Sequence, residues 1–198
     1  EKKIIGFYGV DNPPAESLDY VSDMLHIMGS FIVSSIRRRN LLRQLERMSY
    51  RDQLTQFGNR YAVDWFVEHE WNGEQIGVVY CDITGLKKVN DEQGHEAGDR
   101  LIIRACECLA GVFKGYGLYR IGGDEFLVLC LGIEEKDLRE HVEKLHMDMK
   151  EHQVTMAVGM IWKEHGPKDI DLLLNESERL MYEDKDRYYK EHGLKRRR

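Results

Sequence analysis

Residues 118–131 read Leu-Tyr-Arg-Ile-Gly-Gly-Asp-Glu-Phe-Leu-Val-Leu-Cys-Leu, which is two apolar runs separated by a pair of glycines. Paired glycines tolerate the positive φ angles of a tight turn, so the stretch predicts a hairpin with strands at 118–121 and 125–131. Two carboxylates, Asp124 and Glu125, begin the returning strand, where neighbouring side chains point to opposite faces. Because Gly-Gly-Asp is also common in ordinary turns, the stretch alone indicates a structural turn and a reactive site equally well.

A second group of polar residues follows the apolar run at 75–83. Asp82 lies at the end of that run, where a rigid strand presents a carboxylate to a cleft. The following loop and helix start contain Lys87, Asn90, Asp91, Gly94, His95, Gly98 and Asp99. A carboxylate at a strand end and another on a neighbouring hairpin form a donor set that suits Mg²⁺ beside a triphosphate. Asp91 and Asp99 also suit the capping of a helix start, whereas Asn90 with Asp99 has the hydrogen-bonding groups needed to read guanine.

The remaining sequence alternates between helical and strand patterns. Helices are expected at 60–71, 96–113, 134–151 and 170–189, and strands at 75–83, 118–121, 125–131 and 154–162. This order predicts an α+β fold in which the helices pack on one face of an antiparallel sheet.

The first 50 residues form a separate part of the chain. An apolar strand is expected at 3–10, and a helix from 16 to about 50. Apolar residues three and four positions apart mark one side of this helix: Leu18, Val21, Leu25, Met28 and Ile32. The spacing is that of a coiled-coil seam, and its phase shifts at 37–40. We expect residues 1–50 to be the end of an upstream domain with a connecting helix, and residues 51–198 to hold the site. An amphipathic helix docked on another domain explains the spacing equally well.

The composition argues against a nucleic-acid-binding, membrane-spanning or zinc-binding protein. The chain has 198 residues and a net charge of −6, from 29 basic and 35 acidic residues, so no general basic surface points to nucleic acid. No apolar stretch is long enough to cross a membrane, and we expect no membrane contact from these residues. Cysteines lie at 81, 106, 108 and 130, without the spacing of a zinc site. We expect reduced, buried thiols in a cytoplasmic protein.

Several motifs together resemble the GGDEF family of diguanylate cyclases. The hairpin motif is Arg120-Ile-Gly-Gly-Asp-Glu-Phe126, and the opening motif is Asp52-Gln-Leu-Thr-Gln-Phe-Gly-Asn-Arg60. The polar series from Asp82 to Asp99 is similar to the family's D-(I/L)-x-x-F-K-x-x-N-D-x-x-G-H-x-x-G-D stretch, and Thr155–Gly159 with Leu180–Lys185 to its late strand and last helix. The likeness covers the chain from the opening motif to about residue 189. It implies a palm-like, ferredoxin-like antiparallel sheet flanked by helices, preceded by a long N-terminal helix.

The resemblance implies condensation of two GTP molecules into cyclic di-GMP with release of pyrophosphate, in bacterial second-messenger signalling. Each domain would hold one GTP, so a homodimer of two half-sites would be needed. Mg²⁺ or Mn²⁺ would be bound by Asp82, the carbonyl oxygen of Ile83 and Asp124, and Glu125 would join when a second ion is present. Asp124, or a hydroxide on the metal beside it, would help to deprotonate the ribose 3′-hydroxyl, which makes Asp124 and Glu125 the catalytic pair.

The same resemblance implies the substrate-binding residues. Asn90 and Asp99 would bind guanine. Lys87 and Lys185 would contact the phosphates, and His95 completes the substrate-binding set. The alternative is a catalytically inactive GGDEF module that binds GTP or relays a signal. The acids at 82, 124 and 125 favour the enzyme, because a module that only binds GTP has no chemical need for all three, and Asp99 favours GTP over a mixed purine substrate.

Departures from the family pattern concern regulation and phosphate binding. Phe113-Lys-Gly-Tyr116 stands where family members commonly have the R-x-x-D product-binding site, so we expect no feedback inhibition of that kind. Tyr189 stands where an arginine often binds phosphate, and Arg187 is the nearest substitute. Near the start of the chain, Ile5-Gly-Phe-Tyr-Gly-Val-Asp-Asn-Pro13 and the helix after it resemble the end of a GAF sensory domain.

Overall fold

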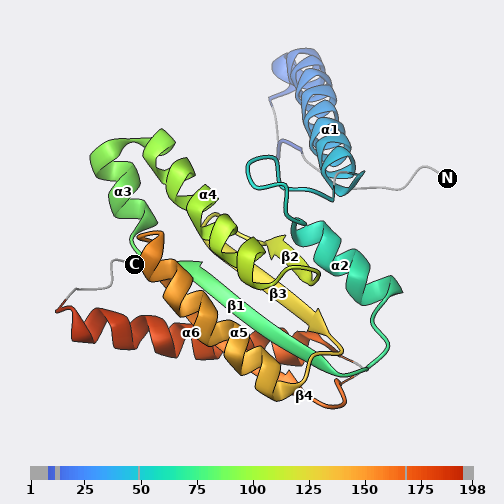
Figure 1. Ribbon diagram of the computed structural model, residues 1–198. Helices are drawn as coiled ribbons and strands as arrows, with labels where there is room; N and C mark the ends of the chain where they lie inside the picture. Colours follow the sequence, from blue (N-terminus) through green and yellow to red (C-terminus); the bar gives the residue numbers. More distant parts are fainter. Residues whose placement is uncertain (1–8, 12–13, 49, 168, 194–198) are drawn as a thin grey trace. The chain divides into compact units, whose positions relative to one another are not determined.

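A computed structural model describes residues 9–11, 14–48, 50–167 and 169–193 (Figure 1). The chain divides into two compact units, residues 1–48 and 49–198. The first unit consists of a short 3-10 helix, η1 (Ala15–Ser17), and one long helix, α1 (Leu18–Met48). The expected helix is therefore confirmed, and it runs through the phase shift without a break. The expected strand at 3–10 falls mainly on residues 1–8, outside the described residues, so the likeness to a GAF domain stays a prediction.

The second unit is built on a four-stranded antiparallel sheet. Its strands are β1 (Ile76–Ile83), β2 (Gly117–Arg120), β3 (Glu125–Leu131) and β4 (Met156–Lys163). They lie in the order β2-β3-β1-β4, so β1 is hydrogen-bonded to β3 on one side and to β4 on the other. The predicted α+β fold and the predicted hairpin of β2 and β3 are confirmed.

Five helices pack around this sheet. They are α2 (Arg60–His69), α3 (Leu86–Gln93), α4 (His95–Val112), α5 (Glu135–Glu151) and α6 (Asp171–Glu191). One hydrophobic core joins α4 and α5 to the sheet face that carries Val79 and Cys81, and the other joins α2 and α6 to the face that carries Val78 and Tyr80. Figure 1 shows α4 and α5 in front of the sheet and α6 behind it.

The expectation that helices pack on one face of the sheet was wrong. All eight residues of β1 are buried, so both faces of this strand need a cover. A strand with one solvent face alternates between apolar and polar residues, whereas Ile76–Ile83 reads as an almost unbroken apolar run. The continuous run in the sequence was therefore the signal that the sheet lies between two helical layers.

Helix α3 was expected to be a loop. Leu86 is its one buried residue among the eight, so the sequence has no apolar face for a periodicity analysis to detect. Gly85 with φ 86° and Gly94 with φ 82° flank the helix, and these angles suit glycine best. The two glycines thus set α3 and α4 as a corner directly after β1.

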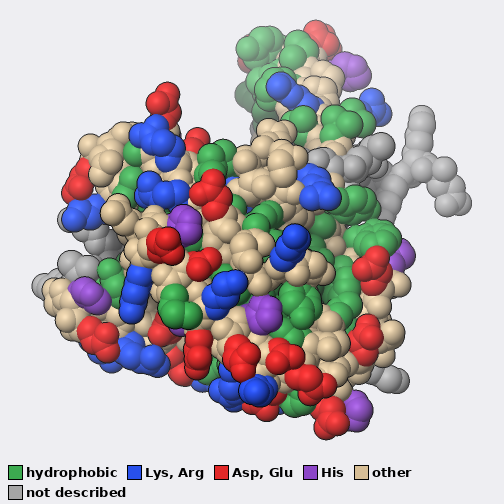
Figure 2. Space-filling view, in the orientation of Figure 1, with side chains coloured by type: hydrophobic (Ala, Val, Ile, Leu, Met, Phe, Trp, Pro, Cys, Tyr) green, Lys and Arg blue, Asp and Glu red, His purple; other side chains and the backbone are tan. Residues whose placement is uncertain are grey.

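The surface and the cysteines agree with the composition. Acidic and basic side chains are interspersed on the face shown in Figure 2, with no continuous basic area there. The four cysteines are free and buried in the core, as expected. Within the described residues, no helix combines the length and apolar character needed to span a bilayer.

Candidate active site

Three predicted acids lie at the same end of the two inner strands of the sheet. Asp82, near the end of β1, is only 4% exposed and lies opposite Glu125 in the register of β1 and β3. The main-chain N–H of Ile83 donates a hydrogen bond to the carbonyl oxygen of Asp124 at 2.9 Å. The hairpin turn is thus fastened to the end of the central strand, which brings Asp124 and Glu125 to Asp82.

Lys185 joins this cluster from the last helix. Its Nζ atom lies 2.6 Å from Oδ1 of Asp82, and both side chains are largely shielded from solvent. A buried carboxylate needs a hydrogen-bonded or charged partner, because the cost of removing it from water is otherwise uncompensated. The predicted metal ligand and the predicted phosphate ligand are therefore in direct contact.

The cluster carries an excess of negative charge. Burial raises the pKa of Glu125, and the neighbouring carboxylates of Asp124, Asp82 and Glu178 raise it further, while Lys185 acts in the opposite direction. A cation placed among these oxygens would relieve the repulsion. Gly122 makes room for Glu125, because a Cβ atom at position 122 would collide with the Glu125 side chain.

Arg120 connects the hairpin turn to Asp52 by an ion pair and a main-chain hydrogen bond. Nη1 of Arg120 lies 3.1 Å from Oδ1 of Asp52, and its Nη2 donates to the carbonyl oxygen of Gly123 at 2.7 Å. Asp52 also accepts hydrogen bonds from the main-chain N–H and the hydroxyl of Thr55, at 2.9 and 2.7 Å. Burial alone would raise the pKa of Asp52, but the hydrogen bonds from Thr55 and Arg120 outweigh it and lower the pKa.

This link was missed in the sequence. Asp52 and Arg120 belong to the opening motif and the hairpin motif, but nothing in either motif assigns them to each other. They are 68 positions apart, and only the fold brings them together. The place of Arg120, directly before the hairpin turn, was the one available signal.

The two proposed guanine-binding residues, Asn90 and Asp99, lie at the corner between α3 and α4. Oδ1 of Asn90 lies directly over Gly98, so a Cβ atom at position 98 would displace the Asn90 side chain. Asp99 follows Gly98 on α4 and is exposed. Lys87 and His95 are exposed on the same two helices. In the described part of the chain, neither of these two makes a hydrogen bond or an ion pair with the carboxylate cluster.

The donor set fits a divalent ion that arrives with a nucleotide. Within the described ranges, no three His, Cys, Asp or Glu side chains converge closely enough to hold a metal alone. Mg²⁺ is usually held by one or two carboxylates and by the phosphates of its substrate rather than by a complete protein cage. Asp82 and Asp124, with the main chain at Ile83, supply that partial set.

Comparison with known proteins identifies the family. A family model described as diguanylate cyclase, GGDEF domain, matches residues 49–190. The chain belongs to the GGDEF family.

Relatives of this GGDEF protein include a diguanylate cyclase and a bifunctional enzyme. The chain is 28% identical to the diguanylate cyclase DgcP of Escherichia coli, over 82% of the chain and 54% of DgcP. It is 29% identical to MucR of Pseudomonas aeruginosa, a bifunctional diguanylate cyclase/cyclic di-GMP phosphodiesterase, over 79% of the chain and 25% of MucR. The chain thus spans a quarter to about half of the length of these relatives.

Solved structures confirm the GGDEF fold. The coiled coil and GGDEF domain of DgcB from Caulobacter crescentus, a complex with c-di-GMP, superposes with a TM-score of 0.62 at 19% identity. The match covers 86% of this chain and 96% of the DgcB structure. At this level of identity the likeness establishes the fold alone.

Three residues at or beside departures from the GGDEF pattern have partners of another kind. Phe113 and Tyr116, in place of the product-binding R-x-x-D pair, both contact the ring of His141, with centroid distances of 5.6 and 6.0 Å. Arg187 pairs with Asp184 at 3.2 Å. Arg187 lies two residues after Lys185, which places it about 200° around the helix from Lys185, so its role as a substitute for the missing arginine stays a prediction.

Proposed function

We propose that this chain is a diguanylate cyclase that condenses two GTP molecules into cyclic di-GMP and releases pyrophosphate. The observation that carries the proposal is the position of Asp82, Asp124 and Glu125 at the same end of β1 and β3, beside Lys185. The cyclase names of DgcP and MucR support it. The proposal implies a cytoplasmic protein that draws on cellular GTP.

The chain's own residues account for nucleotide binding. Asn90 and Asp99, at the corner of α3 and α4, would accept and donate hydrogen bonds on the edge of guanine. Lys185 would turn from Asp82 to the phosphates once a divalent ion shares that carboxylate. Lys87 and His95 are exposed near the start of α3 and of α4, where a triphosphate would pass.

The carboxylates account for the reaction. Mg²⁺ or Mn²⁺, held by Asp82, Asp124 and the Ile83 carbonyl, would neutralise charge on the triphosphate. Asp124 would take the proton of the ribose 3′-hydroxyl, whose oxygen then bonds to the α-phosphorus of a second GTP. The bond from that phosphorus to the bridging oxygen breaks, and pyrophosphate leaves. The same step in the opposite direction closes the ring, so two domains must face each other as a homodimer.

The direct test is product formation by the full chain. We expect cyclic di-GMP and pyrophosphate from GTP and Mg²⁺, measured by chromatography, in samples whose mass by light scattering is that of a dimer. Asp124→Asn removes the base, so the rate should fall by about 10²–10⁴-fold while GTP still binds. A dimeric wild type that binds GTP and yields no cyclic di-GMP would contradict the proposal.

A second candidate function is a GGDEF module that binds GTP and relays a signal without chemistry. It is favoured by the ion pair that Lys185 makes with Asp82, and by Tyr189 in place of a phosphate-binding arginine. The phosphodiesterase PdeR of Escherichia coli, 29% identical over 75% of this chain, also shows that relatives carry other activities. GTP binding without turnover in the assay above would favour this candidate.

A further inference from the structure

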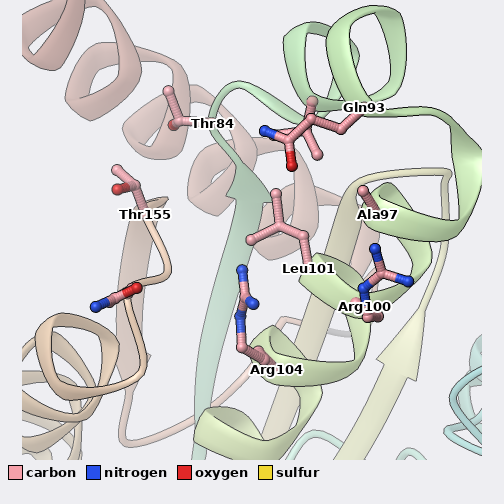
Figure 3. Close-up of a pocket in the computed structure, with 9 residues that line it drawn as sticks. Thr84, Gln93, Ala97, Arg100, Leu101, Arg104 and Thr155 are labelled. Carbon is pink, nitrogen blue, oxygen red and sulfur yellow. The ribbon is translucent and has the colours of Figure 1, made fainter.

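A pocket of about 270 Å³ lies beside α3 and α4, at the residues that lead into β4 (Figure 3). Its polar lining consists of Thr84, Gln93, Arg100, Arg104, Gln153 and Thr155. The main-chain N–H of Thr84 donates to the carbonyl oxygen of Thr155 at 2.9 Å, which fixes one wall of the pocket to the sheet. The opposite wall is formed by side chains of α3 and α4.

The lining of this pocket is positively charged, whereas the chain as a whole has a net negative charge. Two arginines and no carboxylate line it, although the chain has 35 acidic and 29 basic residues. Figure 3 shows the guanidinium of Arg104 pointing into the space framed by Thr84, Leu101 and Thr155. The pocket is therefore a local concentration of positive charge on an acidic protein.

The hydrogen-bonding groups of the pocket are only partly used. Arg104 makes no hydrogen bond or ion pair with another described residue. Arg100 lies 4.0 Å from Glu96, and both of these side chains are well exposed, so this ion pair is weak. The hydroxyl of Thr84 is buried and has no partner in the described part of the chain. A buried hydroxyl without a partner costs stability, and an occupant of the pocket could supply one.

The pocket is distinct from the proposed guanine site. Ala97, Arg100, Leu101 and Arg104 follow one another at helical spacing and share one face of α4. Asp99 is two residues from both Ala97 and Leu101, which places it about 200° around the helix, on the other side. A ligand of the pocket would therefore not be a ligand of Asp99.

We propose that this pocket binds a small oxyanion of the phosphate type, either inorganic phosphate or a small phosphate monoester. The planar guanidinium groups of Arg100 and Arg104 match the oxygens of a phosphate, and threonine hydroxyls and glutamine amides can donate the remaining hydrogen bonds. Sites for drug-sized ligands measure about 300–1,000 Å³. At about 270 Å³ the pocket holds a phosphate group and a few further atoms, not a cyclic dinucleotide.

The test is a titration of the full chain followed by nuclear magnetic resonance, without GTP or divalent metal. Inorganic phosphate and glycerol 3-phosphate are added separately, against sodium chloride at the same ionic strength. We expect saturable shifts of the main-chain amides of Gln93, Gln153 and Thr155, and of the Nε–H of Arg104. Tighter binding of glycerol 3-phosphate would identify a monoester as the ligand, and equal or weaker binding would identify inorganic phosphate.

A pair of matched double variants tests the arginines. Arg100→Gln with Arg104→Gln should weaken phosphate binding at least about tenfold, whereas Lys136→Gln with Arg139→Gln removes two charges from α5 and should change it little. All four side chains are exposed, so the amide spectrum should report folded protein in both cases. Equal weakening in both variants, shifts centred on Lys185, or no saturable shift at tens of millimolar phosphate would each overturn the proposal.

Discussion

Glu125 stands out among the single side chains because the fold favours its neutral form. Its pKa is raised, so between the usual glutamate value of 4.5 and the raised value the folded state binds more protons than the unfolded state. The stability linked to this group is complete below the usual value and is lost as the pH rises through the raised one. Glu125→Gln, which is neutral at every pH, should therefore stabilise the metal-free protein at pH 7.

The expected gain is up to about 1 kcal/mol, because water partly reaches and screens this side chain. Thermal unfolding from pH 4 to pH 8, without metal or nucleotide, would measure it. The gain should disappear below the usual glutamate pKa. Asp99→Asn, at an exposed acid, is the control and should change little. A Glu125→Gln protein that is less stable than the wild type at pH 7 would show that the neighbouring carboxylates do not repel.

Asp52 behaves in the opposite way. Its pKa is lowered, so the stability it contributes is present above the usual value of 3.8 and is lost as the pH falls through the lowered one. Asp52→Asn keeps an acceptor for Thr55 but removes the charge that faces Arg120. We expect a loss of about 1–3 kcal/mol at pH 7, measured by urea unfolding, which shrinks in acid.

The control for this variant is Asp64→Asn. Asp64 pairs with Arg60 at 3.5 Å on the surface, with both side chains more than half exposed, so its loss should cost less than about 0.5 kcal/mol. If the two substitutions cost the same, the link from Asp52 through Arg120 to the hairpin turn adds nothing to stability.

The sequence indicates which acidic residues share the site, but it does not indicate which basic residues pair with them. Asp82 and Glu125 lie at strand ends that a hairpin and its neighbouring strand must bring together. The ion pair of Lys185 with Asp82 joins residues 103 positions apart and depends on how the last helix crosses the sheet. No local pattern encodes that crossing. The roles of Asn90, Asp99, Lys87 and His95 remain predictions until substrate binding is measured.

The position of helix α6 depends on a glycine in β4. A Cβ atom at Gly159 would collide with main-chain atoms of Ser177 and Met181, so helix and strand approach closely there. Gly159→Ala should cost at least about 1–3 kcal/mol by overpacking. Because α6 carries Lys185, the shift should also weaken its contact with Asp82. Urea unfolding would measure the loss.

Gly111→Ala is the matched control for this element. The nearest atom to a Cβ at Gly111 would be 3.7 Å away, and the residue lies inside α4. Alanine should therefore stabilise the helix by about 0.5–1 kcal/mol. A Gly159→Ala protein as stable as the wild type would mean that α6 can move away from β4 without loss.

The elements also show where periodicity analysis succeeds. Helices with a buried apolar face, such as α4 and α5, were predicted to within about two residues at each end. Helix α3 was missed because its residues are polar and its ends are set by glycine conformations. The segment that carries Asn90 was thus expected as a polar loop before a helix, and its own helical backbone was not foreseen.

For the whole molecule, the long helix α1 predicts association. Several large apolar side chains on it are exposed, including Met28 and Ile32 of the predicted seam. Met28→Glu with Ile32→Glu should place like charges in a parallel coiled coil and give a monomer by light scattering. Cyclic di-GMP production should then fall at least about a hundredfold, because half-sites no longer meet.

His26→Glu with Ser30→Glu is the control for the seam. It adds the same acidic residues about a third of a turn or more away from the centre of the seam and should leave mass and activity near those of the wild type. Should both variants remain dimeric and active, another surface of the chain must bring the two domains together.

The fold class followed from the order of helices and strands, while the two-sided packing did not. The order of helices and strands follows from local sequence patterns. The motifs at 52–60 and 120–126 then indicated the GGDEF fold. The cover on each face depends on contacts between distant helices. The unbroken apolar run of β1 carried that information, but a buried strand and a half-buried one differ only in a few positions.

The position of β1 between β3 and β4 determines how the site comes apart when the protein unfolds. Its amide groups are hydrogen-bonded to β3 on one side and β4 on the other, so they can exchange with deuterium only when the sheet itself comes apart. We therefore expect slow exchange in this strand, which carries Asp82. Proteolysis or fraying at the surface would therefore leave the acid in place, and disassembly of the site and unfolding of the domain become one cooperative event.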